Sequence, residues 1–196
     1  MTSEILIDAD RLHICIGKIV VKFQLIENVI AEVLASLLKM RGSEDIHRVT
    51  AAMSYAQKLN LMCDLYDDRK SPEWPSIDLE SVRNALMSAE TFRNSVVHSL
   101  WFFGGEQRQW MRAKANLRNG GKLKIVTGPA NIEALEEAVS CLSLISDWYL
   151  GRSAQLAVAT SSLNQLSKEL SVRQSKAKQV VQTVRCTHWD GLKPAP

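Results

Sequence analysis

The sequence lacks several features that would assign a function class directly. Its four cysteines lie far apart and form no C-x-x-C pair, so they provide neither a zinc ribbon nor a dithiol redox motif. No apolar run approaches the roughly 18 residues that a membrane-spanning helix needs. The acidic residues Glu4, Asp8 and Asp10 occupy the region where a secretory signal carries positive charge. These absences predict a cytoplasmic protein with reduced cysteines, no membrane partner, and no metal or other cofactor.

A strong net charge is also missing. The 24 Lys and Arg residues against 21 Asp and Glu residues give a net charge of +3, which neither requires nor excludes a nucleic-acid partner. Basic residues nevertheless outnumber acidic ones from residue 168 onward. At 196 residues the chain is long enough for one well-buried domain. We predict one domain over residues 1–170 and a basic, partly disordered tail over residues 171–196.

Apolar residues at steps of three and four predict a mainly α-helical fold. The expected helices run from near residue 11 to Gly42, from 43 to about 66 with a break near Thr50 and Ser54, from 76 or 78 to about 100, and from 131 to 149. The predicted N-caps of these four helices are Asp8 or Asp10, Ser43, Ser76 or Asp78, and Asn131. The last of these keeps a weaker helical pattern over residues 153–170. Two prolines within the polar stretch 67–76 predict a loop there.

The pattern changes after Trp101, where short extended segments alternate with glycine pairs. Gly104 and Gly105 precede one such segment, and Asn119-Gly120-Gly121 separates it from the next. An Asn-Gly turn between two extended runs is typical of a hairpin. The sequence therefore predicts a bundle of four or five helices with a small antiparallel β-hairpin or meander inserted at about residues 101–127.

The third predicted helix ends in a compact polar cluster. Glu90, Asn94 and His98 stand at i, i+4 and i+8, so a helix stacks them in one stripe, with Arg93 within side-chain reach. A histidine can exchange a proton near neutral pH, and a guanidinium can hold a phosphate through two parallel hydrogen bonds. Such a set suits cleavage of a phosphodiester by an internal 2′-hydroxyl. Because one helix offers one histidine, a two-fold dimer is the simplest way to supply both acid and base.

The run from Glu90 to His98 resembles the signature of the HEPN superfamily, an arginine and a polar residue followed by a histidine. The middle of the first predicted helix, Phe23-Gln24-Leu-Ile-Glu27, is also similar to that of small HEPN-like proteins, and the resemblance covers roughly residues 8–150. It implies a metal-independent endoribonuclease of the toxin or antiviral-defence kind. Its composite site would lie at a homodimer interface, and a cognate inhibitor or partner protein is a further expectation.

Carried over residue by residue, the resemblance gives each member of the cluster a role. His98 would be the acid or base, Arg93 the contact to the phosphate, and Asn94 the residue that orients either one. Glu90 would hold Arg93 at i, i+3. Two alternatives remain open: an ordinary helix C-terminus, in which Glu90 and Arg93 form a solvated ion pair, and a non-catalytic HEPN-like module that binds a partner protein or nucleic acid.

The predicted hairpin adds a second candidate site. Basic residues interleave there with Trp110, a combination that could track a phosphate backbone and stack a base. A solvated strand face of alternating charge would give the same pattern. The predicted RNA-binding residues are Arg112, Lys114, Arg118, Lys122 and Lys124.

Overall fold

A computed structural model describes residues 3–104, 109–117, 123–150 and 153–176. These residues form six α-helices, one 3₁₀ turn and three strands. The elements are α1 (Ser3–Leu37), α2 (Ser43–Ala51), α3 (Tyr55–Arg69), α4 (Leu79–Val97), β1 (Leu100–Gly104), β2 (Gln109–Leu117), β3 (Leu123–Pro129), α5 (Ile132–Ser146), η1 (Trp148–Leu150) and α6 (Ser153–Lys176). The predicted fold class, a helical bundle with a small β insert, is confirmed.

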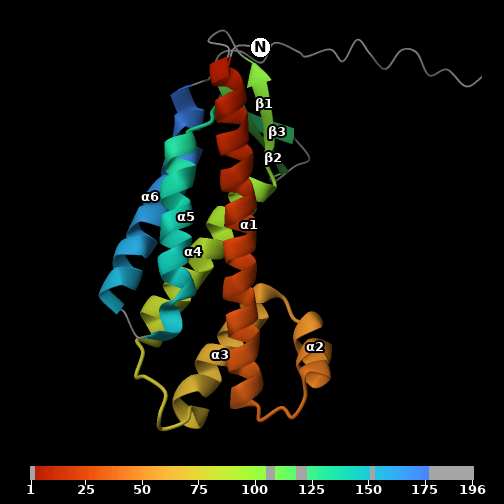
Figure 1. The fold of residues 1–196 in the computed structure, drawn as a ribbon, viewed down its shortest axis with the longest axis vertical. Coiled ribbons are helices and arrows are strands. Elements are labelled where there is room, and N and C mark those ends of the chain that lie inside the picture. Colours follow the sequence, from red (N-terminus) through yellow and green to blue (C-terminus); the bar gives the residue numbers. More distant parts are fainter. Residues whose placement is uncertain (1–2, 105–108, 118–122, 151–152, 177–196) are drawn as a thin grey trace, which may run out of the picture.

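The long helix α1 is the element against which most of the others pack. Its apolar stripe is fully buried at Leu12, Ile19, Ile26 and Ile30. Helices α3, α4 and α5 lie along α1, and α6 packs on α4 and α5 (Figure 1). The sheet lies near the N-terminal end of α1, whereas α2 stands at its C-terminal end, to one side of the bundle (Figure 1). One core therefore runs through the helices, as expected when each helix buries one stripe.

The first helix is longer at its N-terminus than predicted. It begins at Ser3 rather than near Arg11, so that Asp8 lies inside the helix, where it pairs with Arg11 one turn later at 3.5 Å. Arg11 also donates hydrogen bonds to Glu133 and Glu136 of α5. At the other end the helix stops at Leu37, before Gly42, and the next turn uses the left-handed conformation of Lys39 (φ 54°).

The predicted break in the second helical segment separates α2 from α3. Ser54 is the N-cap of α3 and forms a capping box with Gln57, in which each side chain accepts a hydrogen bond from the other residue's backbone N–H. Two predicted caps are confirmed, Asp78 for α4 and Asn131 for α5. The cap of α2 is Gly42 and not Ser43. Local capping chemistry thus accounts for most of the helix starts.

The chain after α5 differs from the prediction of one continuing helix. The 3₁₀ turn at Trp148–Leu150 follows α5, and α6 is a separate helix that packs on both α4 and α5. Trp148 is only 2% exposed, and burying this large side chain contributes to the core at the turn. This turn and the break before Ser54 raise the number of helices among the described residues to six.

The sheet has the strand order β1-β2-β3 and is antiparallel throughout. Trp101 is paired with Arg112, and Phe103 with Trp110. The indole N–H of Trp101 donates to the Val96 carbonyl at 3.1 Å, so β1 is tied directly to the last turn of α4. The sheet is thus attached to the end of the helix that carries the polar cluster.

Candidate functional site

The predicted cluster occupies the last turns of α4. Asp78 starts this helix by accepting hydrogen bonds from the Ser81 hydroxyl and from the backbone N–H groups of Ser81 and Glu80, and these bonds lower the pKa of its carboxyl. Buried residues such as Phe92 and Val96 fix the rotation of the helix about its axis. That rotation sets the directions in which the polar side chains of the cluster point.

Arg93 lies against α1 rather than in open solvent. Its guanidinium carbon is 5.2 Å from the centroid of the Phe23 ring, a cation–π arrangement. Its Nη1 donates to Asn94 Oδ1 at 2.8 Å, and its Nε is buried without a hydrogen-bond partner. Within the described residues Arg93 forms no ion pair with a carboxylate. Its charge is therefore held in place but not neutralised by a salt bridge.

Glu90 is half-buried beside Arg93 and Asn94. Burial raises the pKa of its carboxyl, and repulsion from Glu27 of α1 adds to the effect, while Arg93 and Asn94 partly offset it. The predicted ion pair between Glu90 and Arg93 is not among the salt bridges of the described residues. Glu90 is thus near Arg93 without an ion pair to it, and its environment makes the carboxyl harder to ionise than one in open solvent.

His98 lies apart from Arg93. It is the C-cap residue of α4, its backbone N–H bonds to the Asn94 and Val96 carbonyls, and its side chain is exposed. Among the described residues its imidazole has no hydrogen bond or ion pair. The apolar side chains of Val97 and Leu100 beside it are also exposed, by 37% and 67%. One chain therefore groups Glu90, Arg93 and Asn94 but leaves His98 at the helix end.

The structure adds Glu27 and Lys58 to the cluster. Lys58 Nζ is 2.8 Å from Glu27 Oε1, and their side chains are only 10% and 26% exposed. No sequence pattern indicates this pair, because the two residues are 31 positions apart and belong to different helices. Of the two residues, only Glu27 lies in the segment that resembles HEPN-like proteins, one turn after Phe23.

A polar cavity of about 470 Å³ opens next to this pair, between α1, α2 and α3. Its polar lining includes Gln24, Asn28, His47 and Thr50 besides the ion pair of Glu27 and Lys58. His47 is exposed and borders this cavity. No group of three or more His, Cys, Asp or Glu side chains that could hold a metal ion occurs in the described part of the chain.

The basic residues of the sheet are placed differently from one another. Arg112 is 6% exposed, and its guanidinium donates to the Ser95 carbonyl, the Ser99 hydroxyl and the Leu170 carbonyl at 2.8, 2.8 and 3.1 Å. It also stacks on Trp101, 5.9 Å from the ring centroid. Burial lowers its pKa. Arg112 therefore connects the sheet to α4 and α6 instead of lining a solvent-facing surface.

The other members of the predicted basic surface are less defined. Lys114 is partly buried, and burial together with the charge of Arg112 lowers its pKa. Lys124 is paired with Asn116 across β2 and β3. Arg118 and Lys122 lie outside the described residues. Of the members of this set whose side chains the structure describes, Arg112 is buried and hydrogen-bonded, whereas Lys114 is only partly buried.

Comparisons of the chain with protein-family models, with curated proteins and with solved structures gave no match. No helix in the described ranges has the length and apolar character needed to cross a membrane.

Proposed function

We propose that the protein is a metal-independent, HEPN-like endoribonuclease that works as a homodimer in the cytoplasm, with a role as a toxin or phage-defence effector. The observation that carries the proposal is the state of Arg93. Its guanidinium is fixed by Phe23 and Asn94, yet it has no carboxylate partner among the described residues. A preorganised cation without a carboxylate partner suits a phosphate whose charge increases in the transition state.

The proposed reaction uses two copies of the chain. His98 of one copy accepts the proton of the ribose 2′-hydroxyl, whose oxygen then attacks the adjacent phosphorus. The bond from phosphorus to the 5′-oxygen breaks, and the protonated His98 of the second copy donates a proton to that oxygen. The products are a 2′,3′-cyclic phosphate and a 5′-hydroxyl, and Arg93 stabilises the charge of the intermediate phosphorane.

Two features support a second copy. A single α4 leaves His98 exposed at its end, whereas Arg93 is directed to Phe23 of α1. The exposed apolar side chains of Val97 and Leu100 flank His98, and burying them against another chain would be favourable. A dimer that covers these two residues would bring two histidines into one cleft. Lys114 of the sheet is then the described basic residue available to contact the RNA backbone.

The test is RNA cleavage in the presence of EDTA by the wild type and by His98→Ala, Arg93→Ala and Arg93→Lys. We expect cleavage by the wild type, loss of at least about 100-fold in both alanine variants, and partial activity in the lysine variant. His13→Ala is the matched control, because His13 is an exposed histidine of α1 that packs on Trp110. Circular dichroism checks that each variant is folded.

A non-catalytic binding module is the second candidate, and the separation of His98 from Arg93 within one chain favours it. That function predicts no cleavage by any form, together with RNA or protein binding that depends on Arg93 but not on His98. Sedimentation equilibrium, which measures the oligomeric state, distinguishes the nuclease from the binding module further. Catalysis requires a dimer that Leu100→Asp weakens, whereas a monomer that cleaves RNA would contradict the composite site.

A further inference from the structure

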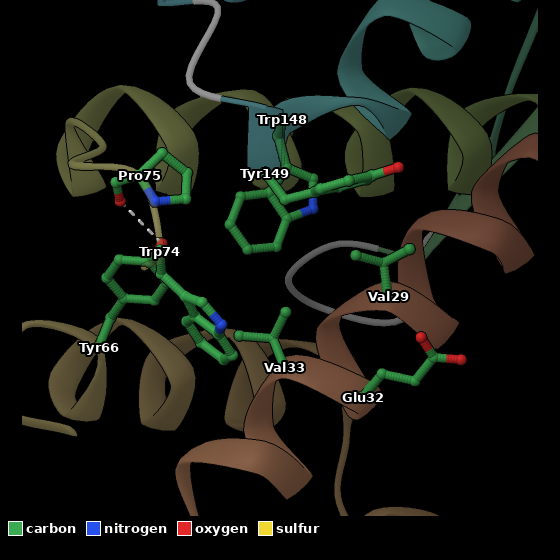
Figure 2. Close-up of a pocket in the computed structure, with 8 residues that line it drawn as sticks. All are labelled: Val29, Glu32, Val33, Tyr66, Trp74, Pro75, Trp148 and Tyr149. Carbon is green, nitrogen blue, oxygen red and sulfur yellow. Dashed lines mark hydrogen bonds between the residues drawn. The ribbon is translucent and has the colours of Figure 1, made fainter. Parts of the chain in front are cut away.

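A second cavity, of about 360 Å³, lies between α1, the end of α3, the loop before α4 and the 3₁₀ turn (Figure 2). Its walls are largely aromatic, with Tyr66, Trp74, Trp148 and Tyr149 grouped around it. Val33 of α1 forms part of the apolar floor (Figure 2). Both the volume and the apolar character fall within the range of small-molecule sites.

Trp148 offers an unused hydrogen-bond donor at this cavity. The residue is 2% exposed, and its Nε1 is buried without a partner in the part of the chain that the structure describes. Figure 2 shows this nitrogen on the pocket side of the ring, and the nitrogen of Trp74 also turned inward. A buried N–H without an acceptor is unfavourable, and a ligand that supplies an acceptor would remove that penalty.

Tyr149 lies beside Trp148 at this cavity. The two rings meet edge to face with centroids 6.3 Å apart, and Tyr149 is 41% exposed. Rotation of such an exposed side chain is fast. By contrast, the hydroxyl of Tyr66 is already used, because it donates to the Pro75 carbonyl at 3.1 Å (Figure 2). Tyr66 therefore contributes ring surface, and the indoles contribute the donors.

The charge of the cavity is negative. Glu32 of α1 lines it, is exposed, and has no ion pair within the described residues, whereas no lysine or arginine is among the lining residues. An anionic ligand is thereby disfavoured. Flat apolar walls, an indole donor and a carboxylate acceptor together suit a planar ring system that carries both an acceptor and an N–H group.

We propose that this cavity binds a planar nitrogen heterocycle of the nucleobase class, stacked on the aromatic walls, with a ring nitrogen or carbonyl accepting from Trp148 and an N–H donating to Glu32. The site is independent of the proposed ribonuclease function. Val29, which lines this cavity, projects about 160° around the α1 axis from Glu27, which borders the α4 cluster. Loss of RNA cleavage would therefore leave this proposal untouched.

Calorimetric titration at pH 8 tests it with four uncharged planar probes. Adenine represents the proposed class. Benzimidazole has both an acceptor nitrogen and an N–H group, indole of the same shape has the N–H group alone, and 1-methylbenzimidazole has the acceptor alone. Tetramethylammonium represents the organic cations that aromatic cages also bind. We expect adenine and benzimidazole to bind, and indole to bind about tenfold more weakly because it cannot accept from Trp148.

Two variants address the walls and the carboxylate separately, without altering the core residue Trp148. Trp74→Leu should weaken every planar probe by about tenfold. Glu32→Ala should lower the affinity for benzimidazole to the affinity for 1-methylbenzimidazole. Glu73→Gln is the control, since Glu73 is an exposed acid of the same loop that does not line the cavity, and it should change nothing.

Nuclear magnetic resonance gives an independent readout from the five tryptophan indole N–H signals. Benzimidazole should shift two of them, one of which is absent in Trp74→Leu. Saturating indole should shift the Trp148 signal less, because it accepts no hydrogen bond from it. Equal affinity for indole and benzimidazole would overturn the proposal. So would binding of tetramethylammonium with no binding of the planar probes, or no binding of any probe at millimolar concentration.

Discussion

The ion pair of Lys58 and Glu27 should stabilise the fold measurably, although most surface pairs do not. Lys58 Nζ and Glu27 Oε1 are 2.8 Å apart, and the two side chains are 10% and 26% exposed. At this distance the attraction is about 6 kcal/mol for an effective dielectric constant of 20, and desolvation of the two groups cancels much of it. Lys58→Met would leave Glu27 partly buried beside Glu90 without its cation. We expect a loss of about 2 kcal/mol of unfolding free energy.

A double-mutant cycle isolates the pair from other effects of each substitution. Glu27→Gln alone leaves a partly buried ammonium beside a neutral amide and should cost about 1–2 kcal/mol. The double variant removes both charges, so its cost should fall below the sum of the two single costs by about 1–2 kcal/mol. Urea unfolding at 25 °C and pH 7, followed by circular dichroism, gives all four free energies.

The pair of Arg48 and Glu44 serves as the matched comparison. It joins α2 residues at i, i+4 with a separation of 3.3 Å, but its side chains are 75% and 83% exposed. Its coupling should be below about 0.5 kcal/mol and should vanish in 0.5 M NaCl, whereas the coupling of Lys58 and Glu27 should largely persist. A Lys58–Glu27 coupling below about 0.3 kcal/mol, or one that salt removes equally, would refute the reasoning that burial strengthens this pair.

Three further substitutions test other parts of the molecule. Arg112→Met should lower the free energy of unfolding in urea by about 2–4 kcal/mol, because it removes three hydrogen bonds and leaves the Ser95 and Leu170 carbonyls without this donor. A loss under about 1 kcal/mol would contradict this role of Arg112. Gly17→Ala should stabilise by about 0.5–1 kcal/mol, since Gly17 is an exposed residue inside α1 and an added Cβ meets no atom within 4 Å; a lower melting temperature would point to an unseen contact. Burial raises the pKa of Glu90, so the native state loses stability as pH rises through that pKa. Glu90→Gln should therefore be more stable than the wild type at pH 8, and this difference should shrink toward pH 4. A difference in stability that does not vary with pH would contradict the raised pKa.

Most of the fold was predictable because its determinants are local. The caps at Ser54, Asp78 and Asn131 bond to backbone N–H groups within three residues, so the sequence around each one contains the whole interaction. Glycine pairs and alternating residues likewise marked the three strands. The start of α1 was missed because Asp8, a residue type that favours N-caps, lies inside the helix, where it pairs with Arg11 at i+3.

The parts that were not predictable depend on contacts between distant segments. Lys58 reaches Glu27 across 31 residues, and Arg112 reaches the Leu170 carbonyl across 58. Neither contact leaves a periodic or compositional signal in either segment. Arg112 shows the consequence, because an arginine that alternates with other residues in a strand has the same pattern whether it faces solvent or closes a buried junction. Only the packing of α6 against the end of α4 next to the sheet shows that Arg112 is buried rather than facing solvent.

The geometry of α4 explains why the proposed catalysis requires a second chain. Residues five positions apart on a helix differ by about 140° around its axis and by about 7.5 Å along it. Arg93 points toward Phe23 of α1, whereas His98 is exposed at the end of α4. A phosphate held by Arg93 therefore does not contact the imidazole of the same chain. A two-fold axis near Val97 and Leu100 would place the His98 of each copy near the Arg93 of the other while covering both apolar side chains. The same exposed residues would then serve association and catalysis together, and a substitution such as Leu100→Asp should reduce both in parallel.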